Sequence, residues 1–330
     1  MDSARETVRL IGLDWGSSSL RGWLFDASGR ILDERSAPLG ILAVRDRRFD
    51  RVFERFCADW LAERPTLPVV ASGMIGSRQG WREAAYLATP ASLDALAGAL
   101  LDLDEVAGRR FRIVPGLVTR SASGAPDVLR GEETQVFGAL CSSANTATTD
   151  DGVDRLFVLP GTHSKWVATQ GTTVTGFRSW MTGELYAVLR EHSILGRMFA
   201  EATDPDAAGA MAAFDDGVDR ALTAPGALAH LLFTVRTEGL LGERAADRQP
   251  AYLSGLLIGA EIADALRVFG GRSAASGATP LASPTIVASA SIAGRYRRAL
   301  LRAGVDAQIA DGASAAPGLF AIAFRSGLLA

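Results

Sequence analysis

The sequence has few of the residues that form disulfides or bind transition metals. Its 330 residues include 2 cysteines, Cys57 and Cys141, and 3 histidines. Neither residue type occurs at the short spacings that zinc sites and redox pairs use. We therefore expect no catalytic transition metal, and a chain suited to a reducing compartment.

Long apolar runs and an excess of basic charge are also missing. The longest apolar stretches, 227–235 and 251–260, are too short to span a bilayer. Residues 1–6 are polar and charged, unlike a signal peptide. The formal net charge is −3, which does not favour binding to a nucleic-acid backbone. We expect a cytoplasmic protein with no membrane and no nucleic-acid partner.

The signatures of three common enzyme classes are absent. The chain has no Gly-x-x-x-x-Gly-Lys-Ser/Thr, no Gly-x-Ser-x-Gly, and no Gly-x-Gly-x-x-Gly after a strand. These absences disfavour P-loop kinases, α/β-hydrolases and dinucleotide-binding enzymes.

A strand–turn–strand pattern near the start of the chain is the strongest feature present. Residues Val8–Leu13, Leu20–Phe25 and Arg30–Arg35 read as three consecutive strands. Asp14 ends the first strand, and the turn Gly16-Ser17-Ser18-Ser19 follows it. Backbone N–H groups of such a turn can bind phosphate, and an acid at a strand end can hold Mg²⁺. An ordinary hairpin with an exposed acid is the alternative.

Residues 156–178 repeat this order. An apolar strand leads into the turn Gly161-Thr162-His163-Ser164, and two further strands follow, the first opening with Lys165. Two copies of one phosphate-binding hairpin indicate two similar domains that face a shared cleft. We place these domains at residues 1–142 and 143–330, because 141–153 is small, polar and acidic.

The loop at residues 73–81 is rich in glycine and contains Ser77 and Arg78. Such a loop could lie under a small polar substrate, and a guanidinium can fork onto a carboxylate. The alternative is a surface connection with a solvated arginine.

Three acids compete for the role of a general base. Asp127, Glu132 and Glu133 precede or open an apolar helical segment that runs to residue 140. Acids in a first helical turn also stabilise the helix dipole, so capping is the alternative. The pattern does not decide among the three, and we favour Glu132 for its position directly after Gly131.

Periodicity and turn signals predict the remaining elements. Helices are expected at 49–61, 90–103, 181–189, 206–222, 224–236, 250–269, 291–303 and 318–329, and strands at 69–71, 111–114, 285–290 and 307–310. Asp204-Pro205 and Thr223-Ala224-Pro225 supply helix-start signals, and 272–283 is expected to be a loop. These elements predict an α/β protein.

Four sequence words together resemble one enzyme family. They are Leu13-Asp14-Trp15-Gly16-Ser17-Ser18-Ser19-Leu20-Arg21, Gly73-Met74-Ile75-Gly76-Ser77-Arg78-Gln79-Gly80-Trp81, Arg130-Gly131-Glu132-Glu133-Thr134-Gln135 and Leu159-Pro160-Gly161-Thr162-His163-Ser164-Lys165-Trp166. Because it contains these words in this order, the chain resembles the 2-dehydro-3-deoxygalactonokinase family of the actin, Hsp70 and sugar-kinase superfamily. The resemblance extends from about residue 8 to the C-terminus.

The resemblance implies a two-domain actin-like ATPase fold of the ribonuclease H-like type, each domain holding a mixed sheet with a β-meander and flanking helices. It implies ATP and Mg²⁺ as cofactors, with Asp14 on the metal and the Gly16–Ser19 turn, Gly161, Thr162 and Ser164 on phosphates. The adenosine turn would include Ala288 and Ser289, although the paired glycines usual there are missing. The candidates for contacts with the sugar acid are Arg21, Ser77, Arg78, Arg130, His163 and Lys165.

The implied reaction is transfer of the ATP γ-phosphate to the 6-hydroxyl of 2-dehydro-3-deoxy-D-galactonate, in galactonate catabolism. Phosphoryl transfer needs mainly positioning and charge neutralisation. A phosphohydrolase on the same fold and a non-catalytic sugar-acid sensor are the alternatives. The sequence leaves both a monomer and a homodimer open.

Overall fold

The computed structural model describes residues 8–103, 106, 109–143, 153–200, 208–274, 283–310 and 315–329. The chain packs as two compact units. Unit 1 comprises Met1–Asp154, Val167–Phe177 and Asp311–Ala330, and unit 2 comprises Arg155–Trp166 and Arg178–Ala310. Packing thus groups the chain differently from the single boundary predicted between residues 142 and 143, because later segments return to unit 1. The predicted linker falls largely on residues 144–152, which lie outside the described residues. The predicted shared cleft stays a prediction.

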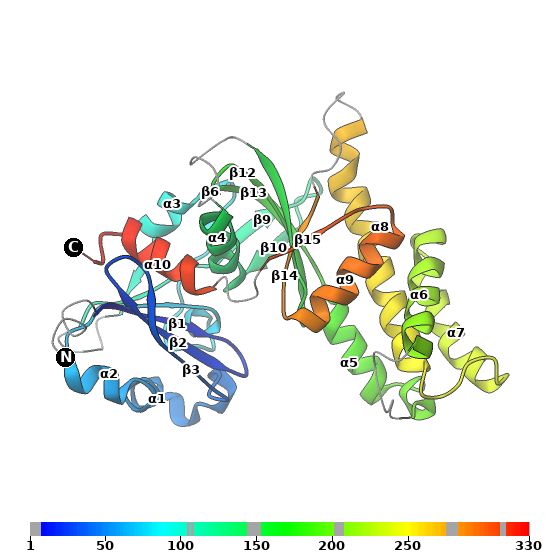
Figure 1. The fold of residues 1–330 in the computed structure, drawn as a ribbon, viewed down its shortest axis with the longest axis horizontal. Helices are drawn as coiled ribbons and strands as arrows, with labels where there is room; N and C mark the ends of the chain where they lie inside the picture. The colour runs from blue at the N-terminus through cyan, green and yellow to red at the C-terminus, as the bar shows by residue number, and fades with distance from the viewer. Residues whose placement is uncertain are drawn as a thin grey trace. The chain divides into compact units, whose positions relative to one another are not determined.

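The larger sheet of unit 1 has the strand order β3-β2-β1-β4-β8-β7. Figure 1 shows its first three strands, β1, β2 and β3, beside one another. Its strands are β1 (Val8–Trp15), β2 (Leu20–Asp26), β3 (Ile31–Ala37), β4 (Val69–Ser72), β7 (Leu101–Asp102) and β8 (Phe111–Ile113). The first predicted meander is confirmed, because β1, β2 and β3 pair antiparallel in sequence. β4 pairs parallel with β1 and places Ser72 beside Asp14. Two polar residues therefore meet where neighbouring parallel strands end.

Burial follows the position of each strand in this sheet. All of β4 is buried, as expected for a strand covered on both faces, whereas β3 at the edge has no buried residue. Helices α1 (Phe49–Phe56) and α2 (Ala58–Glu63) share a core with Ile11 on one face. On the other face lies α10 (Ala315–Arg325), because a Cβ on Gly12 would be 3.3 Å from Leu319 Cδ1.

Two predicted helices of unit 1 differ from the structure. The helix expected at 49–61 is divided at Cys57, whose backbone leaves helical geometry at φ −102° and ψ 11°. The helix expected at 90–103 is wrong at both ends, because β6 (Ala91–Ser92) and β7 flank a shorter helix, α3 (Leu93–Gly98). The Ser92 side chain accepts a hydrogen bond from the Ala95 N–H at 3.1 Å and so caps α3 at that point.

A second, smaller sheet in unit 1 leads directly into a long helix. Its order is β10-β9-β5, formed by β5 (Leu87–Ala88), β9 (Leu117–Arg120) and β10 (Pro126–Leu129). Helix α4 (Glu132–Ser143) begins three residues after β10 ends, with Glu132 and Glu133 in its first turn. The predicted acid-rich helix start is therefore confirmed.

The third sheet contains the second predicted meander, which is confirmed. The strand order is β15-β14-β11-β12-β13-β6, where β11 is Asp154–Leu159, β12 is Ser164–Gln170, β13 is Thr173–Trp180, β14 is Thr285–Val287 and β15 is Gln308–Ala310. β14 pairs parallel with β11 and with β15. In unit 2, β14 is followed by a short turn and then by helix α9 (Ala290–Arg302).

The helices of unit 2 surround one long helix. They are α5 (Thr182–His192), α6 (Ala208–Thr223), α7 (Leu228–Leu240), α8 (Gln249–Ala274) and α9 (Ala290–Arg302). Glycines let α6 approach α8, because a Cβ on Gly217 would lie 2.4 Å from the Tyr252 carbonyl oxygen. The helix-start signal at 204–205 and most of the loop expected at 272–283 lie outside the described residues.

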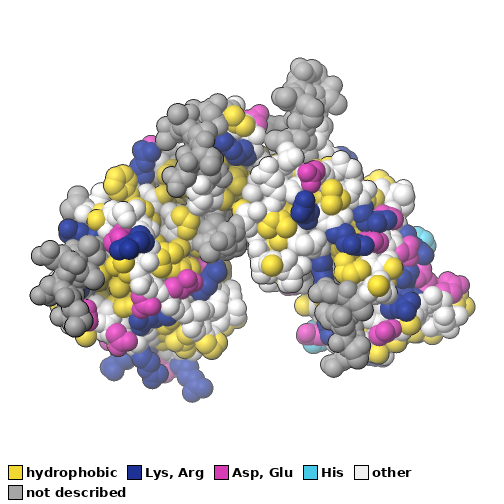
Figure 2. Space-filling view, in the orientation of Figure 1, with side chains coloured by type: hydrophobic (Ala, Val, Ile, Leu, Met, Phe, Trp, Pro, Cys, Tyr) yellow, Lys and Arg dark blue, Asp and Glu magenta, His cyan; other side chains and the backbone are white. Residues whose placement is uncertain are grey.

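The described surface shows mixed charge. Over unit 2, acidic and basic side chains lie side by side (Figure 2), and Asp215 and Asp219 of α6 form ion pairs with Arg298 and Arg302 of α9. No helix within the described ranges has the length and apolar character needed to cross a membrane.

We expect Gly318→Ala to destabilise unit 1. Gly318 lies on α10, and a Cβ there would be 1.9 Å from the backbone oxygen of Thr134 on α4. The two helices would have to separate, which we expect to reduce the free energy of unfolding by about 2–3 kcal/mol. Urea denaturation measures this change. The control is Gly294→Ala on α9, where a Cβ would meet nothing within 4 Å. We expect that control to stabilise by about 0.5–1 kcal/mol, and an equal loss in both variants would contradict the packing explanation.

Candidate active site

The site in unit 1 begins at the carboxyl end of β1. Asp14 lies opposite Arg21 in the β1–β2 pair, and its Oδ2 atom is 2.5 Å from Arg21 Nη2. The exposed fraction of the side chain is 13% for Asp14 and 35% for Arg21. Arg21, expected to contact substrate, therefore forms an ion pair with the residue expected to hold the metal.

The turn after Asp14 is tight and exposed. The Gly16 N–H donates to the Ser19 carbonyl at 2.9 Å, and Ser17, Ser18 and Ser19 are all exposed. Behind the turn, a Cβ on Gly40 would lie 2.2 Å from the Ser17 carbonyl oxygen, so a neighbouring loop is packed against it. The turn thus presents its hydroxyl groups to solvent on a supported backbone, an arrangement suited to phosphate.

Two glycines bring two further segments next to Asp14. Gly73 has φ +91°, and a Cβ on it would lie 3.2 Å from Asp14 Oδ1. Gly131 has φ +103°, and a Cβ on it would lie 3.2 Å from the Cα of Gly73. Such φ values favour glycine. The loop that starts at Gly73 and the start of α4 therefore converge on Asp14, beside the buried Ser72 hydroxyl, which has no hydrogen-bond partner in the described part of the chain.

The two glutamates of α4 differ sharply in environment. Glu132 is half-buried, and its Oε2 accepts the Arg130 N–H at 3.0 Å. Glu133 is fully buried, its Oε2 accepts the Gly131 N–H at 2.7 Å, and its Oε1 accepts the Thr134 hydroxyl at 3.2 Å. Burial, followed by the charge of Glu132, raises the pKa of Glu133 to about 8. We call the place where Gly73 and Gly131 meet beside Asp14 the glycine junction. Of the two glutamates next to this junction, Glu133 is the one whose pKa is raised.

Asp127 occupies a different place. It lies in the middle of β10, paired with Thr119 of β9, and it is half-buried. Three residues of chain lie between it and Gly131, and this stretch spans about 13 Å when extended. The structure thus brings Glu132 and Glu133 to the Asp14 region and leaves Asp127 on the small sheet.

Two further arginines of unit 1 that were predicted to contact the sugar acid, Arg130 and Arg78, differ in burial. Arg130 is 9% exposed, donates from Nη2 to the Ala84 carbonyl at 2.7 Å, and stacks on Tyr86 with its Cζ 4.4 Å from the ring centroid. Its buried Nε and Nη1 atoms have no hydrogen-bond partner among the described residues. Arg78 is exposed, and the neighbouring Ser77 hydroxyl donates to the Met74 carbonyl at 2.7 Å. Arg130 therefore has buried donors that an anion would satisfy.

The second turn, in unit 2, is held by the start of α5. Gly161, Thr162 and His163 are exposed. The Glu184 N–H donates to the Thr162 carbonyl at 2.9 Å, and His163 Nε2 lies 2.5 Å from Glu184 Oε2. A turn with exposed backbone and side-chain donors is therefore present in unit 2 as well.

Ser164, predicted to bind phosphate, and Lys165, predicted to contact the sugar acid, lie deeper than those roles suggest. Ser164 is fully buried and donates its hydroxyl proton to Glu261 Oε1 at 2.6 Å. Lys165 is 4% exposed, and its Nζ donates to the His163 carbonyl at 3.0 Å. In this structure both side chains hold the turn from behind, while its exposed face is formed by residues 161–163.

The predicted adenosine turn lies between β14 and α9. Ala288 is half-buried, Ser289 is exposed, and Ser289 is the N-cap residue of α9 without a side-chain capping bond. The predicted strand–turn–helix is present, although β14 ends at Val287 and α9 starts at Ala290. The N-terminal end of α9 is thus exposed at Ser289. The assignment of this turn to adenosine stays a prediction.

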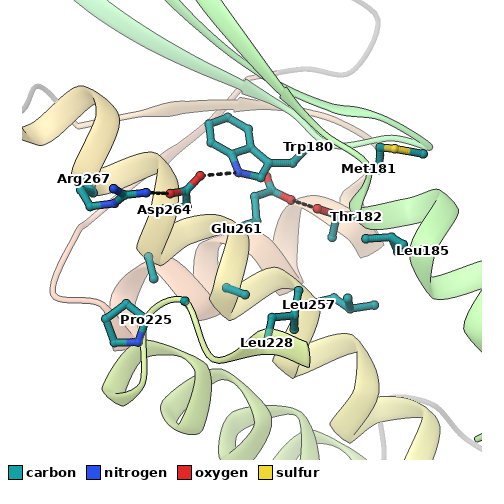
Figure 3. Close-up of a pocket in the computed structure, with 13 residues that line it drawn as sticks. Trp180, Met181, Thr182, Leu185, Pro225, Leu228, Leu257, Glu261, Asp264 and Arg267 are labelled. Carbon is teal, nitrogen blue, oxygen red and sulfur yellow. Dashed lines mark hydrogen bonds and ion pairs between the residues drawn. The ribbon is translucent and has the colours of Figure 1, made fainter. Parts of the chain in front are cut away.

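Sequence reasoning missed Glu261 and the cavity beside it. A cavity of about 570 Å³ in unit 2 is lined by apolar side chains together with Trp180, Thr182, Glu261, Asp264 and Arg267 (Figure 3). The Trp180 Nε1–H donates to Asp264 Oδ2 at 3.1 Å. The available signal was a lone acid in the apolar stretch Leu253–Ile262, where an unpaired charge would be costly.

Comparison with known proteins decides the family. The model of the 2-keto-3-deoxy-galactonokinase family matches residues 14–322. The chain belongs to this family. A Rhizobium meliloti (strain 1021) protein named probable 2-dehydro-3-deoxygalactonokinase DgoK1 is 39% identical over 299 residues, covering 91% of each chain. The Escherichia coli (strain K12) 2-dehydro-3-deoxygalactonokinase is 34% identical over 309 residues, covering 94% of this chain and 95% of its own.

A solved structure agrees with membership in this family. The crystal structure of a Sinorhizobium meliloti protein assigned to the same kinase activity superposes with a TM-score of 0.82 at 36% identity, covering 95% of this chain and 98% of the other. The predicted α/β, two-domain actin-like fold with mixed sheets and meanders is therefore confirmed. The individual site residues remain predictions.

Proposed function

We propose that this chain is an ATP-dependent sugar-acid kinase that phosphorylates 2-dehydro-3-deoxygalactonate on its 6-hydroxyl group. The observation that carries the proposal is the convergence of Asp14, the Gly16–Ser19 turn, Gly73 and the start of α4 in unit 1. This junction combines a metal-binding acid, a phosphate-binding turn and a buried acid. The names of the relatives at 39% and 34% identity support the substrate.

Asp14 suits Mg²⁺ in the form in which kinases use it. Mg²⁺ is usually bound by one or two carboxylates together with substrate phosphates, rather than by a cage of protein ligands. Asp14 is the carboxylate beside the turn, and Gly73, which has no side chain of its own, leaves space at the Asp14 Oδ1 atom. Mg²⁺ held there would neutralise phosphate charge, with Arg21 as the protein cation already paired to Asp14.

We assign the general base to Glu133 and keep Glu132 as the competing residue. The substrate hydroxyl oxygen forms a bond to the γ-phosphorus of ATP, the bond from that phosphorus to the bridging oxygen breaks, and ADP leaves. The hydroxyl proton passes to the Glu133 carboxylate. Bound by the Gly131 N–H, this carboxylate has a fixed orientation, and positive charge bound nearby lowers its pKa from about 8 toward the working range.

Arg130 is the proposed partner of the substrate carboxylate. Its Nε and Nη1 donors have no partner among the described residues and point to different sides of the guanidinium, so one of them can donate to a carboxylate oxygen of the substrate. The Tyr86 ring and the Ala84 carbonyl hold the guanidinium in place. The exposed Arg78 and the half-buried Ser77 lie in the loop that starts at Gly73 and would contact the substrate from there. In unit 2 we assign residues 161–163 to phosphate.

The decisive experiment measures ADP release from MgATP with 2-dehydro-3-deoxygalactonate, with its gluconate epimer, and without sugar. Turnover that depends on sugar and favours the galactonate supports the proposal. A preference for the epimer would overturn the proposed substrate. Phosphate release without sugar would overturn the proposed kinase activity and indicate a phosphohydrolase. A chain that binds the sugar acid without turnover would be a sensor.

A further inference from the structure

We propose that Glu261 is a positioning residue whose buried carboxylate fixes the second phosphate turn and thereby sets the affinity for the phosphates of ATP. The inference rests on the proposed function, because it concerns the same nucleotide. It assigns a role to a residue on α8 that none of the predicted motifs contains.

Glu261 accepts hydrogen bonds from four side chains of unit 2. Its Oε1 accepts the Ser164 hydroxyl at 2.6 Å and the Trp166 Nε1–H at 2.8 Å. Its Oε2 accepts the Thr182 hydroxyl at 2.5 Å and the Tyr296 hydroxyl at 2.7 Å. Figure 3 shows Glu261 reaching from α8 toward Thr182. Two carboxylate oxygens offer about four acceptor positions, so these donors match an ionised glutamate.

The four donors come from the parts of unit 2 that surround the turn. Ser164 directly follows His163, at the end of the turn, and Thr182 is the first residue of α5. The next residues of α5 contact the turn itself, because a Cβ on Gly183 would lie 2.3 Å from the Gly161 carbonyl oxygen. Tyr296 lies on α9, the helix that begins after Ala288-Ser289. One carboxylate therefore connects the turn, its supporting helix and the helix after the predicted adenosine turn.

The chemistry of the donors predicts what a neutral replacement would do. The indole N–H of Trp166 can only donate, so an amide at position 261 must direct its oxygen toward Trp166 and Ser164. Its NH₂ group would then face Thr182 and Tyr296, whose hydroxyls can turn to accept. Glu261→Gln thus keeps the shape and the hydrogen-bond count but removes the charge and loosens the link to α5.

Asp264, one turn further along α8, provides a matched control. It lines the same cavity and forms an ion pair with Arg267 and a hydrogen bond with Trp180 (Figure 3). Its side chain is 41% exposed, whereas Glu261 is buried, and among the described residues its partners Trp180 and Arg267 lie outside the turn. Asp264→Asn therefore changes charge at the same cavity without releasing Ser164 or Thr182.

The test compares wild type, Glu261→Gln and Asp264→Asn in binding of MgADP and of adenosine by calorimetry, and in KM for ATP and for the sugar acid. We expect Glu261→Gln to weaken MgADP binding and raise KM for ATP by about tenfold, while adenosine binding and KM for the sugar acid change less than about twofold. Asp264→Asn is expected to match wild type. Equal losses for ADP and adenosine, or for both substrates, would overturn the positioning role.

Two further points keep the result interpretable. If Glu261→Gln does not fold, Thr182→Val removes one donor and leaves the carboxylate, and the same selective loss of MgADP affinity is expected. An unchanged MgADP affinity in that variant would then overturn the inference. Failure of the proposed kinase would appear as absent sugar-dependent turnover in wild type, whereas failure of the inference would appear as equal MgADP binding by wild type and variant.

Discussion

Replacing Glu133 by glutamine is expected to lower kcat by about 10²–10⁴-fold, because a positioned base contributes that much to proton transfer. Glutamine keeps the volume of the buried side chain, and its oxygen can still accept the Gly131 N–H, which is 2.7 Å from Glu133 Oε2. KM for ATP should change little. Steady-state kinetics with saturating MgATP and sugar acid measure the loss.

Glu132→Gln is the matched control for this variant. It removes an acid of the same type one residue earlier, where the side chain is half-buried and accepts the Arg130 N–H. We expect less than about a tenfold loss in kcat, in line with a lost hydrogen bond. A large loss in Glu132→Gln with an active Glu133→Gln would reverse our assignment and return the base to the residue favoured by sequence position.

The raised pKa of Glu133 gives the same variant a second readout. Its pKa is about 8 in the fold against an ordinary value of 4.5 for a glutamate, so between these pH values the folded chain binds more protons than the unfolded chain. The contribution of Glu133 to stability is thus present below about pH 4.5 and is lost as pH rises toward 8. Glu133→Gln should gain roughly 3–4 kcal/mol relative to wild type between pH 5 and pH 8 in urea denaturation. A constant difference would contradict the buried, proton-binding environment.

Replacing Arg130 by glutamine is expected to raise KM for the sugar acid by about 10²–10³-fold, because truncating one partner of a buried charge pair is costly. Arg130→Lys should recover part of this affinity by restoring the charge without the planar guanidinium. Because Arg130 also donates to the Ala84 carbonyl, thermal unfolding should accompany the kinetics to confirm that each variant is folded.

Arg78→Gln is the control for the carboxylate assignment. Arg78 is an exposed arginine of the loop predicted to contact substrate, and its loss should raise KM for the sugar acid by less than about tenfold, as for an exposed charge. If Arg78→Gln instead produced the larger increase, the carboxylate would bind at the loop. KM for ATP should remain near the wild-type value in both variants.

The sequence predicted the meanders well because local pattern determines them. Alternation, strand ends and Gly/Ser turns lie within a few residues of one another, so Asp14 and the turn after it were visible without a structure. The helix predicted at 90–103 failed because short strands at 91–92 and 101–102 depend on pairing with Val174 and Ile113, which are distant in the chain.

The roles of individual side chains needed long-range information. Ser164 reads as a phosphate ligand in its motif, yet its hydroxyl is bound to Glu261, 97 residues later. Arg130 and Arg78 cannot be told apart in the sequence. The structure distinguishes them, because Arg130 is buried against Ala84 and Tyr86 whereas Arg78 is exposed. Glu132 and Glu133 are adjacent acids, and the one-residue step on α4 decides which is buried.

The glycine junction around Asp14 also limits how this enzyme can be redesigned. Side chains at Gly40, Gly73 or Gly131 would meet backbone atoms of neighbouring segments, so these positions cannot be used to reshape the site. The buried acid takes its orientation from a main-chain N–H, which no substitution at another side chain removes. Attempts to accept other sugar acids should therefore be directed to exposed residues such as Arg78 and Gln79, where variation leaves the catalytic backbone in place.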